Sequence, residues 1–210
     1  MLELLAPAGN LDAVIAAVQN GADAVYMGFG DGFNARRSAD NFTRESFAKA
    51  VRYCHIRGCK VYVTLNTLVG DREMEAAAAL AQQASDAGAD AILVQDLGLA
   101  RVLRDALPDI PLHASTQMSI HNLAGVEAAA EMGITRAVLA RELSLEQIRF
   151  ISQHASIETE AFVHGALCFC YSGQCYMSAL IGRRSGNRGA CAQPCRMQYS
   201  MGGRMDEYPL

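Results

Sequence analysis

The stretch NGADAVYMG, residues 20–28, joins a glycine that can end a helix to a short apolar run. The same order returns in AGADAILVQ at residues 87–95 and in MGITRAVLA at residues 132–140. A helix-ending glycine followed by a buried strand is typical of a chain that builds one helix–strand unit several times. We therefore predict parallel strands that alternate with helices.

The segments on either side of these glycines carry helix and strand patterns. Apolar residues at positions 11, 14, 15 and 18 share one face of a helix, and Ser144 with Gln147 forms a capping-box pattern ahead of another helix. Near-continuous apolar runs bounded by turn residues are typical of parallel strands that are buried on both faces. These runs predict seven strands: Glu3–Leu5, Ala24–Met27, Lys60–Leu65, Ala91–Val94, Pro111–His113, Ala137–Leu139 and Thr159–Val163.

Seven strands with intervening helices favour an α/β fold of the (β/α)8 TIM-barrel type. An open dinucleotide-binding sheet is disfavoured because no GxGxxG follows the first strand. No eighth strand is recognisable after the seventh, so the barrel is expected to be truncated there. Either the chain is a fragment of a longer protein, which we favour, or a partner supplies the missing wall. Residues 1–167 would form the incomplete barrel, and residues 168–210 a Cys- and Arg-rich segment of the same domain that binds a metal centre.

Composition sets limits on location and partners. The chain has 210 residues, 51% hydrophobic and 19% charged, and it has no apolar run of the roughly 18 residues that a membrane span needs. Glu3 stands where a signal peptide would carry basic residues, so we expect a cytoplasmic protein without a membrane partner. The formal net charge of -4 argues against indiscriminate nucleic-acid binding, yet the stretch from Ala161 to Arg204 contains no acidic residue and five arginines.

Four of the seven cysteines share one short window with the spacing C-x6-C-x15-C-x3-C: Cys168, Cys175, Cys191 and Cys195. In a reducing compartment, gathered thiols more often indicate metal or redox chemistry than a disulfide framework. Cys170 lies inside the first gap and suits either a core thiol or a substitute ligand. Cys54 and Cys59 stand apart and are predicted to be ordinary buried thiols.

Polar residues directly after the predicted strands are candidates for catalysis, because active sites of such barrels lie at the carboxyl ends of the strands. For Asn66 and Gln117, hydrogen bonds to loop backbone explain the pattern equally well. Arg141 and Glu142 could be a solvated pair, and His164, four residues before Cys168, could orient a ligand instead of reacting. The predicted catalytic residues are His164, Arg141, Glu142, Asn66 and Gln117.

The stretch from Glu160 to Ser178 resembles the signature of the U32 peptidase family. The signature positions are filled in order by Glu, Phe, Gly, Ala, Leu, Cys, Gly, Cys, Met and Ser. The resemblance extends to LLAPAGNLDAVIAAVQNGADAVYMG at the start, to FNARR at residues 33–37 and to NRGACAQPCR around Cys191 and Cys195. It covers essentially the whole chain as the N-terminal barrel of the family.

The resemblance implies two kinds of function. Some members are described as collagenase-like proteases without a recognised catalytic apparatus. Others resemble oxygen-independent hydroxylation proteins that act on a transfer-RNA wobble uridine, a 23S ribosomal RNA cytidine or a ubiquinone precursor, with a [4Fe-4S] cluster and prephenate as the apparent oxygen donor. The wording of the cysteine window looks most like the RNA-hydroxylating members. By this resemblance, Cys168, Cys175, Cys191 and Cys195 would hold the cluster, although some relatives take the fourth cysteine from a later segment.

The residue chemistry favours the cluster over a hydrolase. A thiol protease using His164 and Cys168 would leave the other three cysteines unexplained, and HExxH is absent from the sequence. A zinc-stabilised scaffold is the third alternative, although spacings of six and fifteen are unlike zinc knuckles. RNA as a partner follows mainly from the resemblance, because no aromatic stacking motif of the RNA-recognition type is evident. Expected partners are RNA, a small dicarboxylate such as prephenate, and a second copy of the chain across the open barrel edges. RNA or a substrate anion would bind to Arg36, Arg183, Arg184 and Arg188. Arg141 could also bind the dicarboxylate.

Overall fold

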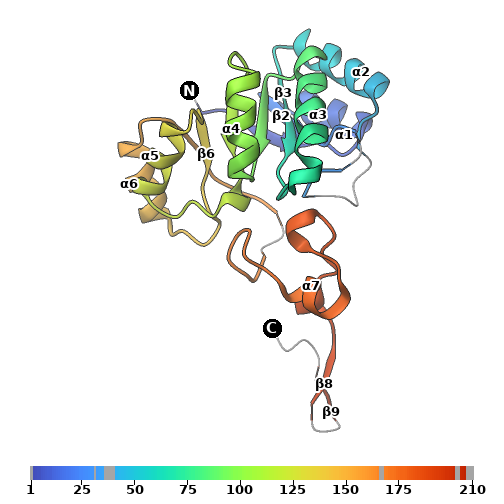
Figure 1. Ribbon diagram of the computed structural model, residues 1–210, viewed down its shortest axis with the longest axis vertical. Coiled ribbons are helices and arrows are strands. Elements are labelled where there is room, and N and C mark those ends of the chain that lie inside the picture. The colour runs from blue at the N-terminus through green and yellow to red at the C-terminus, as the bar shows by residue number, and fades with distance from the viewer. Residues whose placement is uncertain (1, 31, 36–40, 166–167, 202–203, 207–210) are drawn as a thin grey trace.

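The computed structural model describes residues 2–30, 32–35, 41–165, 168–201 and 204–206. Seven parallel strands form one curled sheet in the order β1-β2-β3-β4-β5-β6-β7, with helices along its outer side (Figure 1). The predicted α/β fold, a barrel of the TIM type that stops after its seventh strand, is confirmed. In the described part of the chain, β1 and β7 are the two outer strands of this sheet.

The elements alternate as the recurring glycines predict. The strands are β1 Leu5–Pro7, β2 Ala24–Met27, β3 Lys60–Leu65, β4 Ala91–Val94, β5 Leu112–Ala114, β6 Arg136–Val138 and β7 Glu158–Glu160. The helices between them are α1 Leu11–Gln19, α2 Arg44–His55, α3 Met74–Asp86, α4 Leu97–Ala106, α5 Leu123–Glu131 and α6 Leu145–His154, and short 3-10 turns lie at η1 Asp71–Glu73 and η2 Thr116–Met118.

The ends of the helices have the expected chemistry. Gly21, Gly88 and Gly133 follow α1, α3 and α5 with φ values of +90°, +96° and +80°, a backbone conformation that favours glycine. At the start of α6, Ser144 and Gln147 form a capping box through two reciprocal bonds of 2.8 and 3.2 Å. These turns set where each strand begins.

The two faces of the sheet differ in what they bury. On β3, Val61 and Val63 pack with α1 and α2 in one apolar cluster, and Leu65 joins a second cluster built with α3 and α4. Tyr62 points to the concave inner face, where it packs with small and branched residues such as Leu93. This inner cluster is the smallest of the three apolar clusters, and the inner face of the sheet also carries charged side chains.

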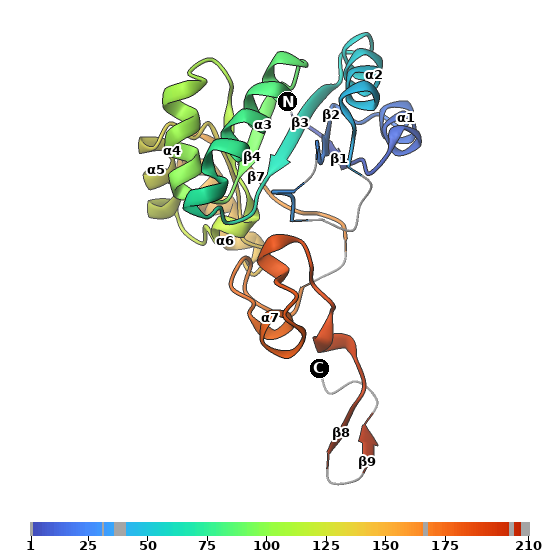
Figure 2. The same cartoon turned by 45° about the vertical axis from the view of Figure 1, so that its right-hand side comes forward.

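Beyond β7 the chain leaves the sheet. The strand was predicted to reach Val163 but ends at Glu160, and Phe162 and Val163 are 47% and 90% exposed. The following segment lies against the end of the sheet where the strands terminate, and a thin hairpin extends from it (Figures 1 and 2). We call residues 168–201 the cysteine lobe; it contains α7 Met177–Gly182, η3 Gly186–Arg188, η4 Pro194–Arg196 and β8 Tyr199–Met201, which pairs with β9 Arg204–Asp206. No helix in the described ranges is long and apolar enough to cross a membrane.

Candidate functional site

The carboxyl ends of the strands are joined to one another by amide side chains. Asn66, after β3, donates to the Ser115 hydroxyl at 3.1 Å and accepts from the Ala35 backbone at 3.0 Å. Gln95, after β4, donates to the carbonyl oxygen of Gln117 at 3.3 Å. Asn66 and the backbone of Gln117 therefore brace the rim of the barrel, in line with the loop-bonding alternative; the catalytic role predicted for them stays a prediction.

Ser172 fastens the cysteine lobe to this rim. It is fully buried, and Glu142 accepts hydrogen bonds from both its backbone N–H and, at 3.2 Å, its hydroxyl. Arg141 donates from Nε to the Ser172 hydroxyl at 3.2 Å, and Ser119 donates to the Ser172 carbonyl oxygen. Arg141 and Glu142 are thus not a free surface pair, because both side chains hold the loop that contains Ser172, although Glu142 stays in contact with solvent.

Gly173, the next residue, allows the lobe to approach the rim this closely. Its φ is +73°, and a Cβ atom built on it would collide with the backbone carbonyl of Gln117. Only glycine meets both conditions without displacing the loop. The close approach of the lobe to the rim therefore explains why the second glycine of the signature stands at position 173.

Arg188 makes a second connection on the other side of the lobe. Its guanidinium donates to both carboxylate oxygens of Glu73 at 2.7 and 2.8 Å and to the Leu68 carbonyl at 2.9 Å. The hydrogen bonds from Arg188 lower the pKa of Glu73 to about 2. Arg188, predicted to meet an external anion, has an internal carboxylate as its partner here.

The thiols lie in the lobe at the barrel mouth. Cys168 and Cys191 are exposed, and Cys170, Cys175 and Cys195 are half-buried. Cys170 contacts the Cys175 thiol, and burial, together with the proximity of Cys175 and Cys168, raises the pKa of Cys170. Cys54 and Cys59 are buried in the barrel, as predicted.

Five thiols in one lobe are the donor chemistry of an iron–sulfur or zinc site, since thiolates are the ligands that both prefer. Nowhere in the described ranges do three or more His, Cys, Asp or Glu side chains stand close enough together to hold a metal ion. The donor set therefore fits a tetrathiolate centre in kind, and binding would have to draw the four sulfurs together.

The remaining predicted residues have different surroundings. Arg183 and Arg184 are exposed at the end of α7, and Arg184 donates from Nε to the Ala190 carbonyl at 3.1 Å. His164 is exposed between β7 and the lobe, and Arg36 lies outside the described residues. Ser172, Ser119 and Thr116, whose hydroxyl donates to that of Ser172 at 3.4 Å, were not predicted at all. Small hydroxyl residues give little signal in one sequence, because their role exists only once two distant loops meet.

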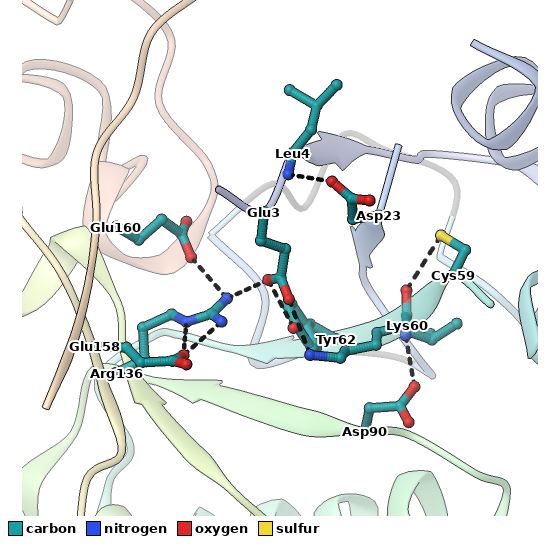
Figure 3. A network of polar contacts seen from close by, with 11 residues as sticks. Glu3, Leu4, Asp23, Cys59, Lys60, Tyr62, Asp90, Arg136, Glu158 and Glu160 are labelled. Carbon is teal, nitrogen blue, oxygen red and sulfur yellow. Dashed lines mark hydrogen bonds and ion pairs between the residues drawn. The ribbon is translucent and has the colours of Figure 1, made fainter. Parts of the chain in front are cut away.

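The inner face of the sheet, near the amino ends of the strands, holds an unpredicted charged network (Figure 3). Arg136 on β6 donates to Glu3 at 2.6 Å and to Glu158 on β7 at 2.6 and 2.9 Å. Glu3 also accepts from Tyr62 at 2.8 Å and from Lys60 at 3.0 Å. Although burial opposes its ionisation, these bonds lower the pKa of Glu3 to about 2.

Two further inner groups have shifted pKa values. Burial raises the pKa of Glu160 to about 7, against the opposing effect of Arg136 3.7 Å away. Burial also lowers the pKa of His113 to about 3, and its ring stands edge-on to Tyr62 with centroids 4.9 Å apart. His113 is thus a buried, structural histidine of the inner face. Charged residues inside otherwise apolar strand segments were the feature of the sequence that could have predicted this network.

Comparison with known proteins agrees with this architecture. The profile of Peptidase family U32 matches residues 9–208. The chain is 46% identical over 200 residues to a 23S rRNA 5-hydroxycytidine C2501 synthase of Escherichia coli and 41% identical over 199 residues to tRNA hydroxylation protein P1 of Bacillus subtilis, in each case over 95% of its length. It spans 30% and 47% of the length of these two relatives. A solved U32 peptidase structure superposes with a TM-score of 0.66 at 17% identity, covering 80% of this chain and 71% of that one, which shows a shared fold.

Proposed function

This chain belongs to peptidase family U32, and from that membership we propose that it acts in the hydroxylation of an RNA base, with an iron–sulfur cluster held by the cysteine lobe. The observation that carries the proposal is identity of 46% and 41% to an rRNA and a tRNA hydroxylation protein, over 95% of the chain in both cases. These matches run through the barrel and the lobe together. The substrate is proposed to be a base in ribosomal or transfer RNA.

The contacts at the barrel rim support a role for the lobe in this chemistry. Glu142 and Arg141 fix Ser172 at the carboxyl ends of the strands, two residues after Cys170 and three before Cys175. Barrel enzymes bind and convert their substrates at that end. This attachment supports the proposal that the thiols of the lobe take part in the reaction.

Cys168, Cys175, Cys191 and Cys195 would hold a [4Fe-4S] cluster, which supplies redox or Lewis-acid chemistry when bound. A small dicarboxylate such as prephenate is proposed as co-substrate, and the exposed Arg183 offers a cation for it. Arg141 is less suited to that part, because its guanidinium already donates to Ser172. Glu142 and Arg141 act as positioning residues for the lobe.

The test is an RNA measurement in the organism that carries the gene. The gene is deleted, total RNA is digested to nucleosides, and hydroxylated nucleosides are quantified by mass spectrometry. We expect one hydroxylated nucleoside to disappear, to return with the intact gene, and not to return with Cys175→Ser. An unchanged nucleoside profile in the deletion strain would contradict the proposal.

A further inference from the structure

Large apolar side chains are unusually exposed in the cysteine lobe. Phe169, Tyr171 and Tyr176 are 72%, 64% and 63% exposed, and Leu180 and Ile181 on α7 are 82% and 61% exposed. Aromatic rings bury 150–250 Å² each when they are covered, so three open rings on one small lobe indicate a surface that is covered in use.

The segments that carry these side chains are brought together by a backbone hydrogen bond and by a contact between two thiols. Tyr176 and Leu180 are four residues apart and are joined by a backbone hydrogen bond of 2.9 Å, which places them on one face of the α7 turn. Cys170 contacts Cys175, so the neighbours of Cys170 in sequence are brought close to Tyr176. The backbone that carries Phe169 and Tyr171 therefore passes close to the start of α7, where Tyr176 stands.

The same surface is held in place and not merely tethered. Tyr171 precedes the buried Ser172, and its ring lies 5.8 Å from that of His121 at the barrel rim. Gln174 closes the turn with a bond of 3.1 Å to the Tyr171 carbonyl and donates from its side chain to Ser119 at 3.0 Å. A loop fixed in this way loses less conformational entropy when a ligand covers it.

The charge at the α7 end of this surface is positive, whereas Glu142 lies at its rim end beside Ser172. Arg183 and Arg184 follow α7 directly, and no carboxylate in the described part of the chain lies within ion-pair distance of either. The sequence from Ala161 to Arg204 holds no acidic residue, although the whole chain carries a formal net charge of -4. The ligand that suits such a surface therefore combines flat apolar faces with negative charge.

We propose that Phe169, Tyr171, Tyr176, Leu180, Arg183 and Arg184, here called the aromatic–arginine surface, bind single-stranded RNA. Unpaired bases would stack on the rings, and phosphates would meet the two arginines. A duplex suits this surface poorly, because stacking on both sides hides its base faces. This inference rests on the proposed RNA function and specifies how the lobe would take an unpaired segment.

The test uses the chain purified without oxygen and measures fluorescence anisotropy with a labelled, unstructured twelve-nucleotide RNA. Tyr176→Ala/Leu180→Ser and Arg183→Ala/Arg184→Ala are compared with Arg149→Ala/Phe150→Ala, a control that removes an exposed arginine and a 54% exposed ring from α6. Circular dichroism and iron content are measured for each variant, since Tyr176 adjoins Cys175.

We expect about tenfold weaker binding for Tyr176→Ala/Leu180→Ser, which corresponds to the loss of roughly one stacked base. Arg183→Ala/Arg184→Ala should make the negative slope of log affinity against log salt concentration shallower by about 1 to 2. The control should bind like the original chain, and the same RNA annealed to its complement should bind at least about tenfold more weakly.

Three results would overturn the proposal: equal effects of the lobe and control variants, equal affinity for single strand and duplex, or a dimer that Tyr176→Ala/Leu180→Ser separates without any change in RNA binding. The last result would assign the surface to a second copy of the chain. Failure here is separable from failure of the proposed function, because a hydroxylated nucleoside that depends on the gene would remain if only the binding surface were wrong.

Discussion

Arg136 connects the two outer strands of the curled sheet, which in the described part of the chain do not pair with each other. It lies on β6, yet it bonds Glu3 ahead of β1 and Glu158 on β7, so one guanidinium links both sides of the curled sheet (Figure 3). Its side chain is only 10% exposed, and the three carboxylates around it exceed the charge that it can balance. Oε2 of Glu160 makes no hydrogen bond, and burial raises the pKa of this carboxyl.

This arrangement predicts that Glu160 makes stability fall as pH rises. Its pKa is raised from 4.5 to about 7, so between these values the folded chain keeps a proton that the unfolded chain releases. Glu160→Gln removes that dependence, and its stability relative to the original chain should rise by about 1–3 kcal/mol from pH 5 to pH 8. Urea unfolding at the two pH values measures the difference.

The lowered pKa of His113 acts in the opposite direction, but it is common to both proteins and cancels in this comparison. Glu131→Gln, at the exposed end of α5, controls for the loss of one negative charge. A difference between Glu160→Gln and the original chain that stays constant with pH would show that the Glu160 carboxyl is ordinary.

At the scale of elements, the loop that contains Ser172 and Gly173 attaches the lobe to the barrel. The attachment uses Glu142 and Arg141 after β6 and the backbone of Gln117 in η2, so two segments of the barrel rim meet this loop. Gly173 carries the steric part of this contact and Ser172 the polar part.

Gly173→Ala should therefore release the lobe while leaving the barrel folded. The added methyl group needs φ of +73° and the space of the Gln117 carbonyl, costs that together exceed about 1.4 kcal/mol. Amide hydrogen exchange in residues 168–201 should be at least about tenfold faster, with exchange in β2, β3 and β4 unchanged. Gly182→Ala is the matched control in the same lobe, because nothing lies within 4 Å of its Cβ position. Equal exchange in both variants would show that Gly173 does not hold the lobe.

The elements themselves were predictable to different degrees. The bounds of β2, β3 and β4 agree with the sequence prediction because continuous apolar runs and adjoining glycines define them. The strands β1, β5 and β6 are shifted by one or two residues, since their runs are short and end in residues that suit strand or loop. The predicted end of β7 at Val163 was wrong, because an apolar residue need not be buried and Val163 is exposed.

At the scale of the whole molecule, the repeated units were readable from sequence and the lobe was not. A barrel repeats one local pattern, whereas the lobe is built from turns and distant contacts such as that of Arg188 with Glu73, 115 residues apart. The spacing of the cysteines predicted a metal centre, but the positions of the thiols relative to the rim depend on Ser172 and Glu142. The roles of Asn66, Gln117 and His164 in catalysis, and the metal itself, stay predictions.

The most direct test is analysis of iron and sulfide in the chain purified without oxygen, together with its visible spectrum. We predict a brown protein with about four irons and four sulfides per chain, lost when Cys168, Cys175, Cys191 or Cys195 is replaced by Ser and kept in Cys54→Ala. A colourless protein that takes up no iron on reconstitution, or one in which only Cys168 matters, would contradict the account.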